Sequence, residues 1–296
     1  MKTRLKSACL SAIALVASGA AYAEPPAWIV SDADSRIILY PIVHALPEGL
    51  DWQSSALASV VAASDEVWLE IGDPNAPGLA DEVSQLVAAH GMSPDLPLSK
   101  RLDADQYAAF SAAVTKLGIP PEALDNFQPW LAALAMTQAE LAAAGITGER
   151  GVEKVLSGLF AGRPVKNLET AAQQTRMLAE LAGDEQVAFL MTAVDTAGTA
   201  STRLLEITRD WAKGDLEGME EMLIAELRAD YPVIYERLFT ARNKAWADIL
   251  TAELAGSGSD FIAVGAGHLI GDDSVQNLLA ARGYAVRKVT ISELTP

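Results

Sequence analysis

The sequence predicts an α/β protein whose central mixed sheet, built from N- and C-terminal segments, is flanked by helices and interrupted by a large helical insertion. Strand-like and helical segments alternate after the N-terminus, helical periodicity dominates from about residue 74 to residue 254, and the alternation returns near the C-terminus. Because sheet-forming segments stand at both ends of residues 24–296, we expect these residues to form a single domain whose sheet is completed by the C-terminus.

Segments rich in β-branched and aromatic residues predict the N-terminal strands, at residues 27–30, 36–43 and 66–70. The first two are separated by the turn-forming segment 31–35, which predicts a hairpin. Between the second and third strands, Leu57, Val60 and Val61 have the spacing of one helix face. Strand, helix and strand therefore follow one another as in an α/β sheet.

Apolar residues spaced 3, 4 and 3 positions apart predict one amphipathic helix of the insertion, at Tyr107, Phe110, Val114 and Leu117. Asp103 is its expected N-cap and Gly118 its expected C′ residue. A second helix, from near Pro129 to Ala144, is apolar almost all round and is therefore predicted to be buried. The remaining elements are a short strand, a longer strand, a helix and a strand, predicted at residues 163–168, 260–264, 274–282 and 284–289.

Residues 1–23 have the organisation of a cleavable export signal. Three basic residues precede an apolar stretch, residues 8–20, which is shorter than the roughly 20 residues that span a membrane. The small-residue pattern ending at Ala23 then predicts cleavage there. We expect a periplasmic or secreted protein with no membrane span after cleavage. The only cysteine, Cys9, lies within the signal, so thiolate metal sites and disulfides are excluded from the mature chain.

The formal charge of the chain is −17, and loss of the basic signal residues makes it more negative. Nucleic acid is therefore an unsuitable partner, because its phosphates repel such a surface. The same charge disfavours anionic membrane surfaces. No feature of the sequence predicts an oligomeric state.

Polar residues that suit catalysis or metal binding follow several predicted strands, at His44, Glu70, Glu169 and His268. If these strands are parallel, their carboxyl ends share one edge of the sheet, where α/β proteins place ligands. Two imidazoles and a carboxylate suit a divalent ion such as zinc or manganese. The simpler alternative is that each histidine is a structural residue. His90, at the end of a predicted helix, is interpreted as structural.

Two glycines, Gly265 and Gly267, precede His268 and resemble part of a dinucleotide-binding loop. We reject that function because Asp272 and Asp273 would place negative charge where a pyrophosphate binds. The glycines are instead expected to allow close approach of the backbone.

An ordered set of short motifs runs through the chain: Leu39-Tyr40-Pro41-Ile42-Val43-His44, Trp68-Leu69-Glu70, Leu168-Glu169-Thr170, Trp211-Ala212-Lys213-Gly214-Asp215, Arg242-Asn243 with Trp246, and Gly265-Ala266-Gly267-His268-Leu269 with Gly283-Tyr284. In content and order these motifs resemble the TraB/GumN family, which includes the Tiki metalloproteases and is related to the erythromycin-esterase and ChaN-like folds. The resemblance spans nearly the whole chain after the signal.

The resemblance implies a sheet flanked by helices and a site made of two Gly-x-x-His motifs and a glutamate, which in the Tiki branch supports manganese- or cobalt-dependent peptide cleavage. Carried over to this sequence, His44, Glu70 and His268 would hold the metal, with Glu70 as a ligand or as the base that activates a water. Arg242 would stabilise the oxyanion. The implied substrate is a peptide or protein.

Glu169 and Asn243 are secondary candidates, and simpler roles stay open for three of these residues. Arg242 and Asn243 also fit surface or helix-packing positions on a long helix. Glu169 also fits a cap of the helix that begins near Thr170.

The first motif departs from the family pattern, because Pro41 stands where a glycine is expected. Proline cannot reach positive φ, so a loop that needs such a conformation must differ here. The leading hypothesis is an exported metal-dependent hydrolase, a Tiki-like peptidase of the periplasm or cell envelope. The alternative, favoured by Pro41, is a non-catalytic envelope factor that binds a peptide or assists polysaccharide assembly. An antibiotic-modifying esterase is a weaker third hypothesis, for which no further motif is present.

Overall fold

The structure is a computed structural model that describes residues 25–160 and 162–295. The predicted export signal and its cleavage site lie outside these residues. Within them, no helix has the length and apolar character needed to cross a membrane.

A mixed six-stranded sheet forms the centre of the protein, with the strand order β4-β3-β5-β2-β1-β6. Its strands are β1 (Ala27–Ser31), β2 (Ser35–Ile42), β3 (Glu66–Leu69), β4 (Val165–Asn167), β5 (Gly258–Gly265) and β6 (Ala285–Val289). β1 is antiparallel to both β2 and β6, whereas β2, β5, β3 and β4 run parallel to one another. The parallel strands therefore end at the same edge of the sheet.

Helices make up most of the rest of the described chain: α1 (Ser55–Ala63), α2 (Leu79–His90), α3 (Leu98–Arg101), α4 (Ala104–Lys116), α5 (Pro121–Leu124), α6 (Pro129–Ala143), α7 (Val152–Leu159), α8 (Ala171–Ala179), α9 (Gly183–Thr196), α10 (Ala200–Lys213), α11 (Leu216–Glu220), α12 (Glu226–Asp230), α13 (Pro232–Tyr235), α14 (Ala241–Leu254) and α15 (Val275–Ala281). Two π-helical segments, η2 (Glu221–Ala225) and η3 (Glu236–Thr240), continue this series, and the 3₁₀ helix η4 (Ala266–Leu269) follows β5.

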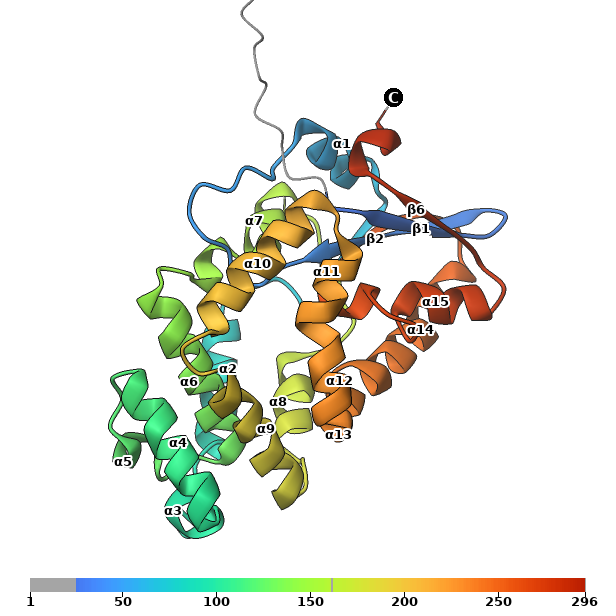
Figure 1. Ribbon diagram of the computed structural model, residues 1–296. Helices are drawn as coiled ribbons and strands as arrows, with labels where there is room; N and C mark the ends of the chain where they lie inside the picture. The colour runs from blue at the N-terminus through green and yellow to red at the C-terminus, as the bar shows by residue number, and fades with distance from the viewer. Residues whose placement is uncertain (1–24, 161, 296) are drawn as a thin grey trace, which may run out of the picture.

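Alternating side chains of the strands bury both faces of the sheet. In β2, Ile38 and Tyr40 lie in a core cluster with α1 and α7, whereas Ile37 and Leu39 lie in a second cluster with α14 and α15. Figure 1 shows these helix pairs on opposite sides of the sheet, which is seen nearly edge-on. The period of two along each strand places successive residues on opposite faces, so the buried run from Ile37 to Ile42 in β2 fits a strand covered on both sides.

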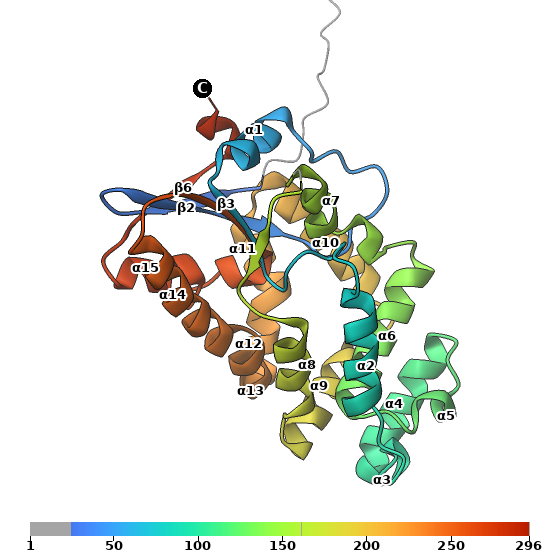
Figure 2. The same cartoon turned by 180° about the vertical axis from the view of Figure 1, so that it is seen from behind.

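A helical lobe extends beyond the carboxyl edge of the sheet, as both views show (Figures 1 and 2). It has its own core, in which α4, α6 and α9 bury residues such as Phe110, Met136 and Leu190. The N-terminus of α4 is fixed by local hydrogen bonds, because Asp103 and Gln106 form a reciprocal capping box. The lobe therefore covers the edge at which the parallel strands end.

The predicted hairpin, the first helix and the C-terminal strand, helix and strand are all present, and the α/β class is confirmed. Asp103 caps α4, and Gly118 has the expected positive φ of 76°. The prediction for α6 was partly wrong, because Leu134 on this helix is 38% exposed. β4 lies inside the segment predicted to be a helical insertion, so the middle of the chain also contributes a strand to the sheet.

Candidate active site

The ends of the parallel strands bring the predicted residues to one edge of the sheet. Glu70 directly follows β3, and Glu169 lies two residues after β4. His44 lies two residues after β2, and His268 is held in η4, which directly follows β5. His44 Nε2 lies 3.8 Å from Glu70 Oε2. β2, β5, β3 and β4 are parallel, so the condition for a shared edge is met, and such an edge is where α/β sheets place ligands.

Gly265 lies where three of these side chains meet. A Cβ at this position would lie 3.1 Å from His44 Nε2, 3.3 Å from Glu70 Oε2 and 3.6 Å from His268 Cδ2. Its φ of −48° is open to any residue, so the glycine is required for space and not for its backbone conformation. Gly267 is crowded in the same way, because its Cβ would lie 2.6 Å from Phe239 Cε1. The expectation of close backbone approach is therefore confirmed.

Both histidines are oriented through Nδ1. His44 Nδ1 lies 3.1 Å from Glu153 Oε1, and His268 Nδ1 lies 2.6 Å from Asn243 Oδ1. Asn243 donates through Nδ2 to the backbone oxygen of Asp273, which assigns its Oδ1 as an acceptor. Each imidazole therefore carries a proton on Nδ1 and directs Nε2 into the site. Asn243 thus positions His268 from a buried place, and it is not a surface residue.

Arg242 lies at the centre of the buried part of the site. Its Nε donates to Glu169 Oε1 at 2.9 Å, and its Nη2 donates to Glu70 Oε1 at 2.5 Å and to Glu169 Oε2 at 3.0 Å. Its Nη1 donates to the Leu238 backbone oxygen and to His268 Nε2, 3.0 and 3.1 Å away. All five N–H groups of the guanidinium are used in these bonds. An oxyanion would therefore have to displace one of the present acceptors.

Glu169 is held away from the helix that follows it. The N-cap of α8 is Thr170, which forms a capping box with Gln173, so the capping role suggested for Glu169 was wrong. Its carboxylate instead accepts from Arg242 and from Trp246 Nε1 at 2.8 Å. Glu169 therefore shares the guanidinium of Arg242 with Glu70.

Burial and neighbouring charges shift the pKa values of the ionisable groups of the site in different directions. Burial opposes ionisation of Glu70, but the neighbouring histidines and Arg242 outweigh it and lower the pKa of Glu70 to about 2. Burial and the guanidinium of Arg242 lower the pKa of His268 to about 3. His268 is therefore neutral at neutral pH, and Arg242 together with His44 keeps Glu70 ionised. Desolvation disfavours protonated His44, but its bond to Glu153 and the charge of Glu70 raise the pKa of His44 above its ordinary value.

Pro41 is accommodated as part of β2. It lies opposite Val264 in the parallel pairing with β5, and its backbone oxygen accepts from Trp211 Nε1 at 3.0 Å. The pairing of β2 with β1 extends only to Leu39, so Pro41 lies beyond it. The strand therefore stays extended past the proline and brings His44 next to Glu70.

Two site residues were missed by sequence reasoning. Glu153, near the start of α7, orients His44, and Gln174 of α8 donates to Glu70 Oε1 at 2.9 Å. They are separated from their partners by 109 and 104 residues, and no motif marks either of them. His90 is the last residue of α2, is exposed, and is not one of the residues of this site.

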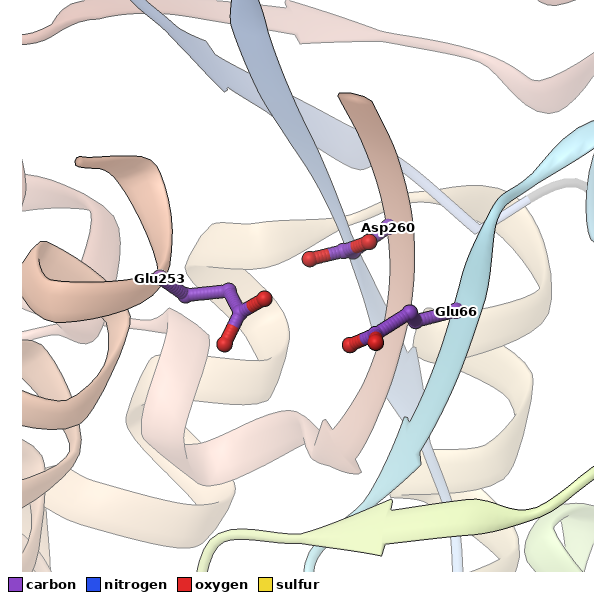
Figure 3. A group of neighbouring side chains, drawn as sticks. All are labelled: Glu66, Glu253 and Asp260. Atoms are coloured by element: carbon purple, nitrogen blue, oxygen red, sulfur yellow. The ribbon is translucent and has the colours of Figure 1, made fainter. Parts of the chain in front are cut away.

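The side chains of the site are of the types that bind divalent ions, but their ligand atoms are not spaced as they would be around a bound ion. His44 Nε2, the Glu70 carboxylate and the edge of the His268 ring lie beside Gly265, and each imidazole has the Nδ1 acceptor that is usual for metal-bound histidine. His268 Nε2, however, accepts from Arg242, which would have to move aside for an ion. Within the described residues, a group of three His, Asp or Glu side chains with ligand atoms within 4.8 Å of one another is found only at Glu66 of β3, Asp260 of β5 and Glu253 of α14 (Figure 3).

Comparison with known proteins gives a family and two distant relatives. A model of the TraB/PrgY/gumN family matches residues 26–288. A curated protein of Amphimedon queenslandica, "Metalloprotease TIKI homolog", is 27% identical over 99 residues, which are 33% of this chain and 17% of that protein. An uncharacterized protein of Treponema pallidum (strain Nichols) is 20% identical over 266 residues, or 86% of this chain and 80% of that protein. No solved structure gives a significant match.

Proposed function

Because the chain belongs to the TraB/PrgY/gumN family, we propose that it is an exported metal-dependent hydrolase, namely a peptidase of the periplasm or cell envelope. The observation that carries this proposal is the meeting of His44, Glu70 and His268 beside Gly265. The similarity of part of the chain to a protein named as a metalloprotease supports it.

His44 and His268 would hold the ion through Nε2, and Glu70 would hold it through Oε2. Manganese, cobalt and zinc all accept imidazole and carboxylate ligands. When bound, such an ion polarises a scissile carbonyl and acidifies a water molecule. Because metals bind neutral imidazole, binding at His44 would release the proton that its raised pKa favours.

The protein's own groups would orient and charge this site. Glu153 and Asn243 fix the directions of the two imidazoles. Arg242 helps to keep Glu70 ionised, which is the form that a metal ligand requires. Glu70 Oε2 is itself held by the backbone N–H of Gly265 at 3.1 Å, which fixes its position beside His44.

A non-catalytic factor that binds a peptide is the second candidate. Its supporting observation is the complete hydrogen bonding of Arg242, which links Glu70, Glu169 and His268 into a network that needs no ligand. On this view the network stabilises the sheet edge, and the surface around it binds a partner.

Calorimetric titration of manganese, cobalt and zinc into the metal-stripped mature protein tests the first proposal. His44→Ala is the main variant, because the side chain of His44 is 56% exposed and its loss leaves the buried network intact. His90→Ala, which removes an exposed imidazole elsewhere, is the matched control. We expect binding that His44→Ala weakens and His90→Ala leaves unchanged, and cleavage of a peptide library by the parent. Absence of ion binding by the parent protein would support the second candidate instead.

A further inference from the structure

Two cavities open on either side of the candidate active site. One has a volume of about 320 Å³ and the other about 390 Å³, at the lower end of the ~300–1,000 Å³ range of ligand sites. Ile42, His44 and Glu70 line both of them, so these residues stand between the two spaces. We call them the α2–α8 cavity and the α10–η3 cavity, after the helices that supply their walls.

The α2–α8 cavity has an apolar wall that the protein itself leaves uncovered. Leu79, Val83 and Val87 recur every four residues along α2 and line the cavity together. No residue of α2 is buried, and Val83 is 38% exposed. Leu134 of α6, also 38% exposed, lines the same space. Exposed apolar surface of this kind, joined to a candidate site, is typical of a surface that binds a ligand.

The α10–η3 cavity has walls of the same chemistry. Leu204 and Ile207 of α10 line it together with Leu223 of η2 and with Leu238 and Phe239 of η3. Among the described residues that line the two cavities, every charged or imidazole side chain belongs to the site itself or orients it: His44, Glu70, Glu153, Arg242 and His268. Neither cavity therefore offers a partner to a charged group away from the site.

Successive side chains of an extended peptide point in opposite directions, so a peptide bond held at His44 and Glu70 would direct its two flanking side chains to opposite sides. We propose, on the basis of the proposed function, that the substrate is an extended peptide with a large apolar residue on each side of the bond that is cleaved, one side chain entering each cavity. In the cleavage, the oxygen of water bonds to the carbonyl carbon, the C–N bond breaks, and the leaving nitrogen takes a proton.

Fluorescent hexapeptides test this specificity: Gly-Gly-Leu-Leu-Gly-Gly and analogues with Ala-Ala, Asp-Asp or Lys-Lys at the centre, assayed for cleavage with manganese and for binding by anisotropy. We expect the Leu-Leu peptide to be cleaved faster and bound more tightly than the others by roughly tenfold or more, since burial of apolar surface in each cavity is favourable. Val83→Asp in one cavity and Leu204→Asp in the other should each weaken the preference for the Leu-Leu peptide over the Ala-Ala peptide.

Matched controls come from the same elements or the same kind of position. Val233→Asp changes an exposed valine of α13, and Leu205→Asp changes the exposed neighbour of Leu204, and neither residue lines a cavity. Both should leave the Leu-Leu preference unchanged. Equal loss in a cavity variant and its control would overturn the assignment of the cavities.

The outcomes separate the specificity from the chemistry. If the Leu-Leu peptide binds, is not cleaved, and binds more weakly to the cavity variants, the result would support the role of the cavities and reject the hydrolase function. Cleavage of all four peptides at similar rates would retain the hydrolase and reject the specificity. Failure of the Leu-Leu peptide both to bind and to be cleaved would reject both, and hydrolysis of fatty-acyl esters in place of peptides would reject the peptide substrate.

Discussion

The carboxylates at the two ends of β3 and β5 have opposite electrostatic environments. At the carboxyl edge, Glu70 is buried, accepts from Arg242, Gln174 and the Gly265 backbone, and has a pKa lowered to about 2. Near the start of β5, burial and the charges of Glu253 and Glu66 raise the pKa of Asp260 to about 6. Both carboxyl groups lie near other charged residues, yet their pKa values are shifted in opposite directions.

The cations of the two regions explain this difference. Arg242 is 12% exposed and forms directed bonds to both Glu70 and Glu169, so each of these carboxylates accepts hydrogen bonds from a buried cation. Lys166 is 43% exposed and pairs with both Glu66 and Glu253, while no hydrogen bond to the Asp260 carboxylate is found in the described part of the chain. The three carboxylates point toward one another (Figure 3). The pKa of each carboxyl group therefore depends less on the number of acidic neighbours than on whether the group accepts hydrogen bonds from a donor.

Removal of Arg242 should have the largest effect. Arg242→Ala leaves Glu70 and Glu169 buried without their cation, and we expect a loss of about 3–5 kcal/mol in the free energy of unfolding, measured by urea denaturation. Arg237→Ala removes an exposed arginine that pairs with Glu185 at 3.4 Å, and should cost less than about 1 kcal/mol. Similar losses in the two variants would show that the buried network does not stabilise the fold.

Gly265→Ala should disturb the carboxyl edge without removing a charge. The added Cβ would crowd His44 and Glu70, and overpacking of this kind costs about 1–3 kcal/mol. We expect weaker ion binding together with a lower melting temperature. Gly158→Ala on α7, where an added Cβ meets nothing within 4 Å, should not lower stability. Unchanged ion binding by Gly265→Ala would place the ion elsewhere.

Asp260→Asn should change stability in a pH-dependent way. Glu253, Glu66 and Asp65 raise the pKa of Asp260, while Lys166 lowers it. Because the folded state binds this proton more tightly than the unfolded chain, the stabilisation is present at low pH and is lost as the pH rises from about 4 through about 6.

The asparagine variant should therefore melt roughly 2–4 °C higher than the parent at pH 7.5, and this gain should vanish near pH 4. Calorimetric melting curves across this range give the measurement, with the exposed loop variant Asp51→Asn as the control for the charge change. A gain of the same size at both pH values would contradict the assignment to Asp260.

The smallest effect is expected at the partly exposed lysine. Lys166→Ala should cost less than about 1 kcal/mol, because solvent screens its pairs with Glu66 and Glu253. The unfolding free energies of Lys166→Ala and Arg242→Ala, measured under the same conditions, compare two cations that each bridge two carboxylates and differ in burial. A loss as large as that of Arg242→Ala would remove the contrast between the two regions.

Local sequence signals predicted the elements that carry the site. Apolar alternation, capping residues and turn residues depend on neighbours a few positions apart, and they located the hairpin, α4 and the strands that end at His44, Glu70 and Gly265. The short β4 was harder to define, since two of its three residues are exposed and give little apolar pattern. The partial exposure of α6 was missed, because its sequence does not reveal which face borders a cavity.

By itself the sequence determined the α/β class, the order of the main elements and the positions of His44, Glu70, Glu169 and His268 after strands, because these follow from local periodicity and chain direction. Only the tertiary structure decided that Arg242 holds Glu70 from 172 residues away, that Glu153 orients His44, and that two apolar cavities flank the site. A hydrogen bond needs its donor and acceptor within about 3 Å, and for residues so distant along the chain only the packing of sheet against helices sets that distance.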